Sequence, residues 1–336
     1  MRNTITMRGM AAELGLSLAT VSKALSGKPE VSGATRERVA AFAKETGYIN
    51  GQKRLPGNGT RVALVIQDAD IEDFGTAFFF GILTGFKQYA KNRGFEVVIL
   101  TISPAEQGLC DYDKYIKDRQ LDGVFVMGLR TTDPYYKQLA RTSVNSVALD
   151  IVMENPLTGS VVVDNLAGAR LAVGHLAGLN HKAIGFINGH GEAYVSRERL
   201  AGYITAMCEN GPVYNPALVY AGDFSEESGA RGAEYLHKMG ATGLFCASDL
   251  MALGAVRKLL SMGLSVPGDV SIVGFDNAPF SQVCSPPLTT VAQDWQRIGV
   301  TACALLDGLM RGIPVNHAVL TPTLIVREST TMRKGE

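Results

Sequence analysis

The stretch GLSLATVSKALSG at residues 15–27 gathers small hydroxyl side chains and one lysine near the start of the chain. Hydroxyl and ammonium groups donate hydrogen bonds to phosphate oxygens, lysine also reaches the acceptor edge of guanine, and short apolar side chains contact the thymine methyl group. Small residues let a helix come close to such a surface, although they make a poor apolar core. The residues that we expect to contact nucleic acid in and next to this stretch are Thr6, Ser17, Leu18, Ala19, Thr20, Ser22, Lys23 and Ser26.

Two short helices would position these residues. Thr6 can cap a helix over about residues 7–14, and Gly15 ends that helix. Ser17 can then cap a second helix that runs to about Leu25. Two short helices joined by a glycine-bearing turn are typical of a helix-turn-helix, whose second helix enters the major groove of DNA.

A third helix is expected from near Ser32 to Gly47, where a glycine can end it. The apolar residues that could form a small core with the first two helices are Met10, Leu14, Leu16, Val21, Leu25, Val39 and Phe42. The alternative to a DNA-binding unit is a structural domain of three helices.

The charge distribution favours the DNA-binding interpretation. Residues 1–60 hold nine Lys and Arg and four Glu, a net charge of +5, so residues 61–336 carry −5 in a chain whose total is zero. A basic head on an acidic body is typical of a small nucleic-acid-binding domain, although a chance imbalance is the alternative.

Other classes of protein find no support in the sequence. The five cysteines are scattered without a CxxC pair, which fits reduced thiols in the cytoplasm. The sequence has no HExxH motif, so we expect neither a metal nor another cofactor. The sequence has neither a run of 18 apolar residues nor a signal-peptide pattern, so we expect neither a membrane protein nor a secreted one. A nucleophile elbow and a P-loop are also missing, so we do not expect an enzyme.

Residues 5–48, ITMRGMAAELGLSLATVSKALSGKPEVSGATRERVAAFAKETGY, resemble the DNA-binding head of the LacI/GalR family of bacterial transcription regulators. The segment ATVSKAL and the later VSGATRERV carry the resemblance, which continues through nearly the whole chain. It implies that Leu18, Ala19 and Lys23 are base-reading positions. Lys23 stands where arginine is commoner, which weakens a bidentate contact to guanine. Gly9 replaces a usual aspartate and Ser26 a common asparagine after the recognition helix.

The linker GYINGQKRLPGNGT at residues 47–60 departs further from the family, which typically has a segment that can fold into a hinge helix on DNA. Proline and glycine directly after Leu55 oppose a helix. Leu55 is a candidate wedge in the minor groove. The alternative is a flexible tether in which Lys53, Arg54 and Arg61 contact phosphates.

From Arg61 on, apolar runs alternate with helical segments, which predicts parallel sheets covered on both faces. The expected strands are 62–67, 95–100, 123–128 and 146–150, followed by 160–164, 183–188, 217–220, 242–248 and 270–276. The fold class is therefore an N-terminal all-α helix-turn-helix domain plus an α/β body of two doubly wound parallel-sheet lobes, similar to periplasmic binding proteins.

The resemblance implies three crossings between the lobes, which we place near 158–162, 288–293 and 318–322. The expected domains are a helix-turn-helix domain at 1–48, a linker at 49–61, an N-terminal lobe at 62–160 and 291–319, and a C-terminal lobe at 161–290 and 320–330.

A ligand of such a body is expected outside the carboxyl ends of the strands. Carboxylates and a guanidinium bind hydroxyl groups, and aromatic rings pack on the apolar face of a sugar. The resemblance implies that Arg199, in SRERLAGY, clamps the ligand. The candidate ligand residues are Phe78, Phe79, Asp150, Arg199, Phe224, Ser248, Asp249, Asp276 and Trp295. Asp249 can instead be a helix cap, Asp276 part of a turn, and Trp295 a packing residue.

The expected function is that of a cytoplasmic transcription regulator, most simply a repressor, that binds a near-palindromic double-stranded DNA operator as a homodimer. A small-molecule effector between the lobes would modulate operator affinity. The resemblance implies a sugar or sugar derivative, the commonest class of effector in the family, and a nucleoside or purine is the alternative. The rivals are a solute-binding protein of the periplasmic type without a regulatory role and an enzyme on an α/β scaffold.

Overall fold

The computed structural model describes residues 7–25, 31–46, 59–67, 75–313 and 317–333. The chain forms two compact units, Met1–Asn58, here called the head, and Gly59–Glu336, here called the body.

The head contains the three expected helices, α1 (Met7–Leu14), α2 (Leu18–Leu25) and α3 (Gly33–Thr46). Gly15 adopts a left-handed φ of +64°, which lets the chain turn between α1 and α2. The residues that form the common core are Met10, Ala11, Leu14, Val21, Ala24, Val31 and Val39, with Leu16 and Phe42 packed against them. The predicted helix-turn-helix arrangement and most of its predicted core are confirmed.

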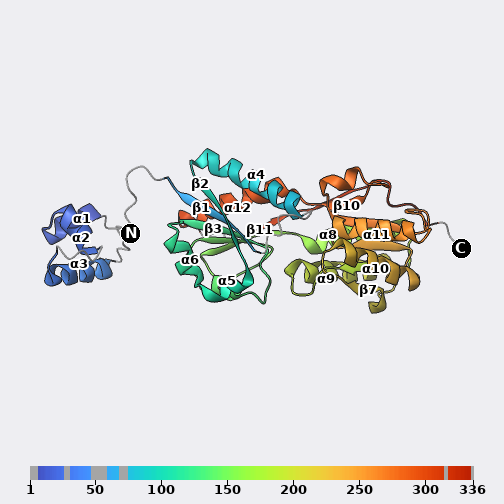
Figure 1. The fold of residues 1–336 in the computed structure, drawn as a ribbon, viewed down its shortest axis with the longest axis horizontal. Coiled ribbons are helices and arrows are strands. Elements are labelled where there is room, and N and C mark those ends of the chain that lie inside the picture. The colour runs from blue at the N-terminus through green and yellow to red at the C-terminus, as the bar shows by residue number, and fades with distance from the viewer. Residues whose placement is uncertain (1–6, 26–30, 47–58, 68–74, 314–316, 334–336) are drawn as a thin grey trace. The chain divides into compact units, whose positions relative to one another are not determined.

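The first lobe of the body is built on a six-stranded parallel sheet in the order β2-β1-β3-β4-β5-β11. Its strands are β1 (Arg61–Gln67), β2 (Glu96–Ile102), β3 (Gly123–Met127), β4 (Ser146–Leu149), β5 (Thr158–Val163) and β11 (His317–Leu320). Helices α4 (Gly75–Arg93) and α12 (Trp295–Met310) cover one face, and α5 (Pro104–Leu109), α6 (Tyr112–Asp118) and α7 (Pro134–Leu139) cover the other (Figure 1).

The apolar runs of this sheet are continuous because both faces are buried. Along β1, Val62 and Leu64 join the core under α4 and α12, whereas Ala63 and Val65 join the core under α6 and α7. Successive side chains of a strand point to opposite faces, so a strand that lies between two helical layers has no polar alternation.

The second lobe repeats this strand order. Its sheet runs β7-β6-β8-β9-β10-β12, with only β12 antiparallel. The strands are β6 (Ile184–Asn188), β7 (Val219–Ala221), β8 (Gly243–Cys246), β9 (Ser271–Asp276), β10 (Thr289–Ala292) and β12 (Thr323–Ile325). The helices are α8 (Asn165–Gly178), α9 (Tyr194–Asn210), α10 (Glu226–Lys238) and α11 (Asp249–Ser261). Two doubly wound parallel lobes confirm the predicted fold class.

The chain passes between the lobes at slightly different places from those expected. Strand β5 pairs with β4 and β11, so the strand that was expected to open the second lobe belongs to the first. The boundaries expected after residues 160, 290 and 319 therefore fall inside β5, β10 and β11. The crossings follow β5, β10 and β11, at Asp164, near Gln293 and after Leu320. A buried apolar strand has the same pattern in either sheet, which is why the sequence could not assign it.

Candidate functional sites

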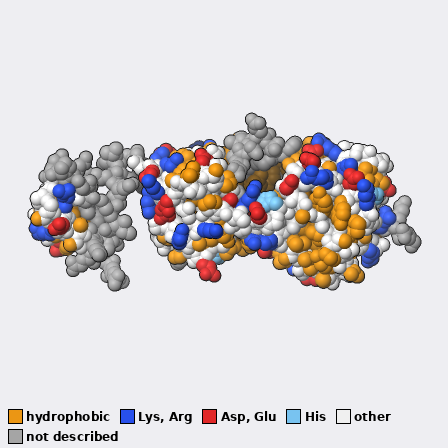
Figure 2. Space-filling model, turned by 60° about the horizontal axis from the view of Figure 1, so that its bottom comes forward, with side chains coloured by type: hydrophobic (Ala, Val, Ile, Leu, Met, Phe, Trp, Pro, Cys, Tyr) orange, Lys and Arg blue, Asp and Glu red, His pale blue; other side chains and the backbone are white. Residues whose placement is uncertain are grey.

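An inter-lobe cleft lies at the carboxyl ends of the strands of both sheets. It consists of two adjoining cavities of about 400 and 300 Å³ that share Phe78, Gly128, Asp150 and Val195. Figure 2 shows the hollow between the lobes, with hydrophobic side chains in its depth and charged side chains at its rim. Both lobes line each cavity, so a molecule bound there would contact both at once.

Seven of the nine predicted ligand residues line the larger cavity: Phe78, Asp150, Arg199, Phe224, Ser248, Asp276 and Trp295. They come from α4, from the ends of β4, β7 and β9, and from the starts of α9, α11 and α12. Strand ends and helix starts thus bring residues that are far apart in sequence to one place.

Asp249 and Phe79 are not among the residues that line either cavity. The Asp249 carboxylate is fully buried and accepts hydrogen bonds from the Ala278 amide at 2.7 Å and from the Thr290 hydroxyl at 2.6 Å. Burial raises the pKa of this carboxyl well above its usual value. Asp249 therefore ties α11 to β10, and Ser248 is the residue that caps α11. Phe79 packs against the core of the first lobe.

Arg199 is the buried cation of the larger cavity. Its Nε donates to Asn165 Oδ1 at 2.8 Å, one of its terminal nitrogens donates to the Ala247 carbonyl, and its guanidinium lies 3.7 Å from the centroid of the Phe275 ring. These contacts fix the orientation of the side chain. Burial lowers the pKa of Arg199, and the charges of Asp276 and Asp150 oppose that change.

Asp150 and Asp276 supply the acidic groups of the cleft. Gln293 Nε2 donates to Asp276 Oδ1 at 2.6 Å. Burial raises the pKa of each carboxyl to about 6, against the opposing effect of the Arg199 charge. The two carboxyls can therefore act as hydrogen-bond acceptors for hydroxyl groups and, when protonated, as donors.

Backbone strain is concentrated at this cleft. Among the described residues, six other than glycine have a left-handed φ, and three of them line the larger cavity: Asp150 at 54°, Phe224 at 69° and Asp276 at 116°. Such conformations are unfavourable for residues with a Cβ and persist where the surroundings hold them. They aim these side chains into the cleft at the expense of local stability.

Polar atoms without partners point to the same place. Among the described residues, six buried side-chain nitrogen or oxygen atoms have no hydrogen-bond partner. Three belong to residues that line the cleft: Asp150 Oδ1, His190 Nδ1 and Trp295 Nε1. Buried polar groups are normally satisfied, so these three atoms indicate where a ligand would supply hydrogen bonds.

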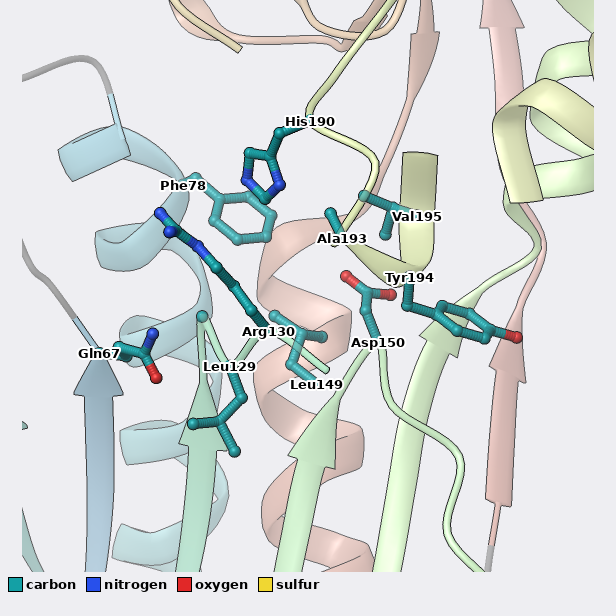
Figure 3. Close-up of a pocket in the computed structure, with 11 residues that line it drawn as sticks. Gln67, Phe78, Leu129, Arg130, Leu149, Asp150, His190, Ala193, Tyr194 and Val195 are labelled. Atoms are coloured by element: carbon teal, nitrogen blue, oxygen red, sulfur yellow. The ribbon is translucent and has the colours of Figure 1, made fainter. Parts of the chain in front are cut away.

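Sequence reasoning missed several lining residues, among them Gln293, Phe280, Arg130 and His190. Arg130 and His190 lie in the loops after β3 and β6, as Figure 3 shows for the smaller cavity. The rule that ligands sit beyond strand ends could have found both, because each follows the end of a predicted strand by two residues.

On the head, Ser17 caps α2 as predicted, because its Oγ accepts a hydrogen bond from the Thr20 amide at 3.0 Å. Ser17, which directly precedes the helix, and Lys23, which lies on it, are both exposed. Leu18, Ala19 and Ser22 lie on α2, but their side chains are outside the described part. Also outside it are the remaining predicted DNA contacts, Thr6, Ser26, Lys53, Arg54 and Leu55.

Within the described residues no group of three or more His, Cys, Asp or Glu side chains could hold a metal ion. No helix in the described part is long and apolar enough to span a membrane.

A helix-turn-helix head and a two-lobed α/β body with a polar and aromatic cleft define a class of proteins that pair DNA binding with ligand binding. Residues 6–50 match the model of the bacterial regulatory proteins of the lacI family, and residues 173–330 match that of periplasmic binding protein-like domains. The chain belongs to the lacI family of bacterial regulatory proteins and is a DNA-binding transcription regulator, not an enzyme.

Two relatives that match nearly the whole chain support the assignment to this family. The chain is 36% identical over 332 residues to the HTH-type transcriptional repressor CytR of Escherichia coli (strain K12), covering 97% of this chain and 96% of that one. It is 32% identical over 340 residues to the HTH-type transcriptional regulator CelR of Thermobifida fusca, covering 98% and 99%.

Solved structures of similar regulators support the same assignment. A complex of the regulator CelR with cellobiose has a TM-score of 0.74 at 32% identity and covers 96% of this chain and 99% of its own. The lac repressor dimer bound to operator and the anti-inducer ONPF has a TM-score of 0.72 at 28% identity and covers 98% and 100%.

Proposed function

We propose that the protein is a cytoplasmic repressor that binds a near-palindromic DNA operator as a homodimer. We propose further that a small hydroxyl-bearing effector, most simply a carbohydrate, binds the inter-lobe cleft and changes operator affinity. The alternative function, that of a solute-binding protein without a regulatory role, does not explain the helix-turn-helix head with its exposed Ser17 and Lys23.

The observation that carries the effector class is the pairing of unsatisfied groups in the larger cavity. Asp150 Oδ1 lacks a hydrogen-bond donor, and Trp295 Nε1 lacks an acceptor. A hydroxyl group is both donor and acceptor, so a polyhydroxylated ligand can satisfy both atoms and also bind Arg199 and Asp276. Trp295, Phe78 and Phe224 supply aromatic surface for the apolar face of a sugar ring. The bound cellobiose of the similar CelR structure supports this class.

The dimer and the palindrome rest on symmetry. Two heads related by a two-fold axis read two half-sites of inverted sequence. The similar lac repressor structure is a dimer on its operator, which supports this part of the proposal. An effector that binds one arrangement of the lobes more tightly shifts the population toward it, and the same preference changes the affinity for DNA.

Selection of bound duplexes from a random DNA library tests the proposal. We expect a near-palindromic consensus for the full chain, which Lys23→Ala loses or relaxes. Lys137→Ala is the matched control, since Lys137 is exposed on α7 of the body. Salt-sensitive binding without any consensus, also after addition of sugars and nucleosides, would contradict operator recognition.

A further inference from the structure

The smaller cavity of the cleft brings together two basic side chains from opposite lobes. Arg130 follows β3 of the first lobe, and His190 follows β6 of the second. In Figure 3 the guanidinium end of Arg130 and the His190 ring both lie next to Phe78, whereas Asp150 lies on the other side of the cavity near Ala193 and Tyr194.

Arg130 is an exposed residue, and no carboxylate among the described residues forms an ion pair with it. The nearest acidic residue along its loop, Asp133, makes its hydrogen bonds to other groups. The Asp133 carboxylate is buried and accepts hydrogen bonds from Gln67 Nε2 and from the Arg130 backbone amide, each at 2.6 Å. Asp133 thus fixes the backbone that presents Arg130 without pairing its charge.

His190 offers a second unsatisfied group. Its Nδ1 is buried without a hydrogen-bond partner, and its ring stands edge-on to Phe224 with centroids 5.3 Å apart. Burial lowers the pKa of His190, and the charge of Arg130 lowers it further, while Glu192 and Asp223 act in the opposite direction. The positive charge of Arg130 therefore reaches the imidazole across the cleft.

A direct hydrogen bond holds these two loops together. The Thr131 hydroxyl donates to the Glu192 carbonyl at 3.3 Å, from the first lobe to the second. The guanidinium and the imidazole are therefore held at the same opening. An anion between them would pair with the Arg130 charge and favour the protonated, hydrogen-bond-donating form of His190, and so would stabilise the contact between the lobes.

We infer that this end of the cleft is an oxyanion subsite, so that the effector carries a phosphate monoester or a carboxylate bound between Arg130 and His190. The inference rests on the proposed function and narrows it. The hydroxyl groups of the effector face Asp150, Asp276 and Arg199 in the larger cavity, and its oxyanion occupies the smaller one. An effector of this kind favours the closed arrangement of the lobes, because its charged group contacts both.

The test compares neutral compounds with their oxyanion derivatives on the full chain. Calorimetry measures dissociation constants for glucose, glucose 6-phosphate and glucuronate, for ribose and ribose 5-phosphate, and for inorganic phosphate alone. The variants are Arg130→Gln and His190→Asn, with Arg141→Gln as control, since Arg141 is exposed in the same lobe and lines neither cavity. The sugar phosphates and glucuronate show whether the subsite prefers a phosphate monoester or a carboxylate.

We expect at least one derivative to bind ten-fold or more tightly than its neutral parent, and Arg130→Gln to abolish that difference while Arg141→Gln preserves it. Two results would overturn the inference: neutral parents that bind as tightly as their derivatives, or no binding of any oxyanion compound at millimolar concentration. Operator selection is independent of these outcomes, so failure here leaves the regulator assignment standing, and loss of the operator consensus would be a separate failure.

Discussion

At the scale of single residues, the cleft combines strained and poorly satisfied groups that reduce stability. Seven of the nine side chains predicted from strand ends, helix starts and the family resemblance line the larger cavity. They failed for Asp249, because a carboxylate at a helix start can turn inward to backbone amides just as readily as outward to a ligand. The sequence also could not predict which of two neighbouring phenylalanines faces the cleft. Phe78 and Phe79 are adjacent on α4, so only the rotation of the helix about its axis decides which one points to the cleft.

Asp276→Asn should raise the stability of the ligand-free protein while it weakens effector binding. Burial raises the pKa of Asp276 to about 6, so the folded state holds its proton more tightly than the unfolded state. The stabilising contribution of this carboxyl is full below about pH 4 and is lost as the pH rises toward 6 and beyond. At pH 8 we expect the variant to gain about 1–3 kcal/mol, or roughly 3–6 °C in the unfolding midpoint, and at pH 4 much less.

Thermal unfolding of both proteins between pH 4 and pH 8 checks this. Asp118→Asn on the exposed surface of α6 is the control and should follow the wild type. A variant that is less stable than the wild type at pH 8 would show that the attraction between Asp276 and Arg199 outweighs the cost of burial.

Trp295 should report effector binding by its fluorescence. It is the only tryptophan in the chain and lines the larger cavity with its Nε1 unpartnered. A ligand in the cavity would displace water from the exposed part of the indole ring, so the emission should change in intensity and shift to shorter wavelength. Titration with a compound that calorimetry shows to bind tests this, and an unchanged spectrum would place that compound elsewhere. Trp295→Phe serves to identify background signal.

At the scale of elements, glycines let helices pack at close range on both lobes. A Cβ built at Gly299 of α12 would lie 1.9 Å from the Ile82 carbonyl oxygen of α4, and one at Gly254 of α11 would lie 1.9 Å from the Glu226 carbonyl oxygen of α10. The two helices of each pair therefore meet backbone to backbone. Nothing in the sequence distinguishes these glycines from others in the same helices.

Gly299→Ala should destabilise the body, whereas Gly308→Ala on the same helix should not. At Gly308 the nearest atom to an added Cβ is Ile313 Cβ at 3.9 Å, which is an ordinary contact. We expect Gly299→Ala to cost about 2 kcal/mol or more, since α4 must move away, and Gly308→Ala to be neutral or to gain up to about 1 kcal/mol through helix propensity. Urea unfolding monitored by circular dichroism compares them, and equal stabilities would mean that α4 yields without cost.

The long, fully buried elements were predictable because their apolar runs leave no alternative. The short ones were not. Helix α5 has only six residues, and the signals for it are the Ser103–Glu106 capping box and Pro104 at its start. Strands β11 and β12 lie at the two sheet edges with half-exposed side chains, so neither has the continuous apolar pattern of a central strand.

At the scale of the whole molecule, the head and the body are separate compact units with their own apolar cores. A fragment of residues 59–336 should therefore fold, bind effector within about three-fold of the full chain, and fail to bind operator DNA. Calorimetry with an effector and a gel-shift assay with the selected operator measure both properties. Operator binding by the fragment would contradict the assignment of DNA contacts to the head.

The passage of the chain between the lobes sets the order in which the nascent protein can fold. β1 starts the first lobe at Arg61, but α12 and β11, which complete it, follow residue 294. Until they leave the ribosome, apolar side chains such as Leu64 and Phe125 lack their cover from α12. A premature stop codon ahead of Trp295 would leave the first lobe without α12 and the second without β12. Such a product would be a substrate for chaperones and proteases instead of a shorter binding protein.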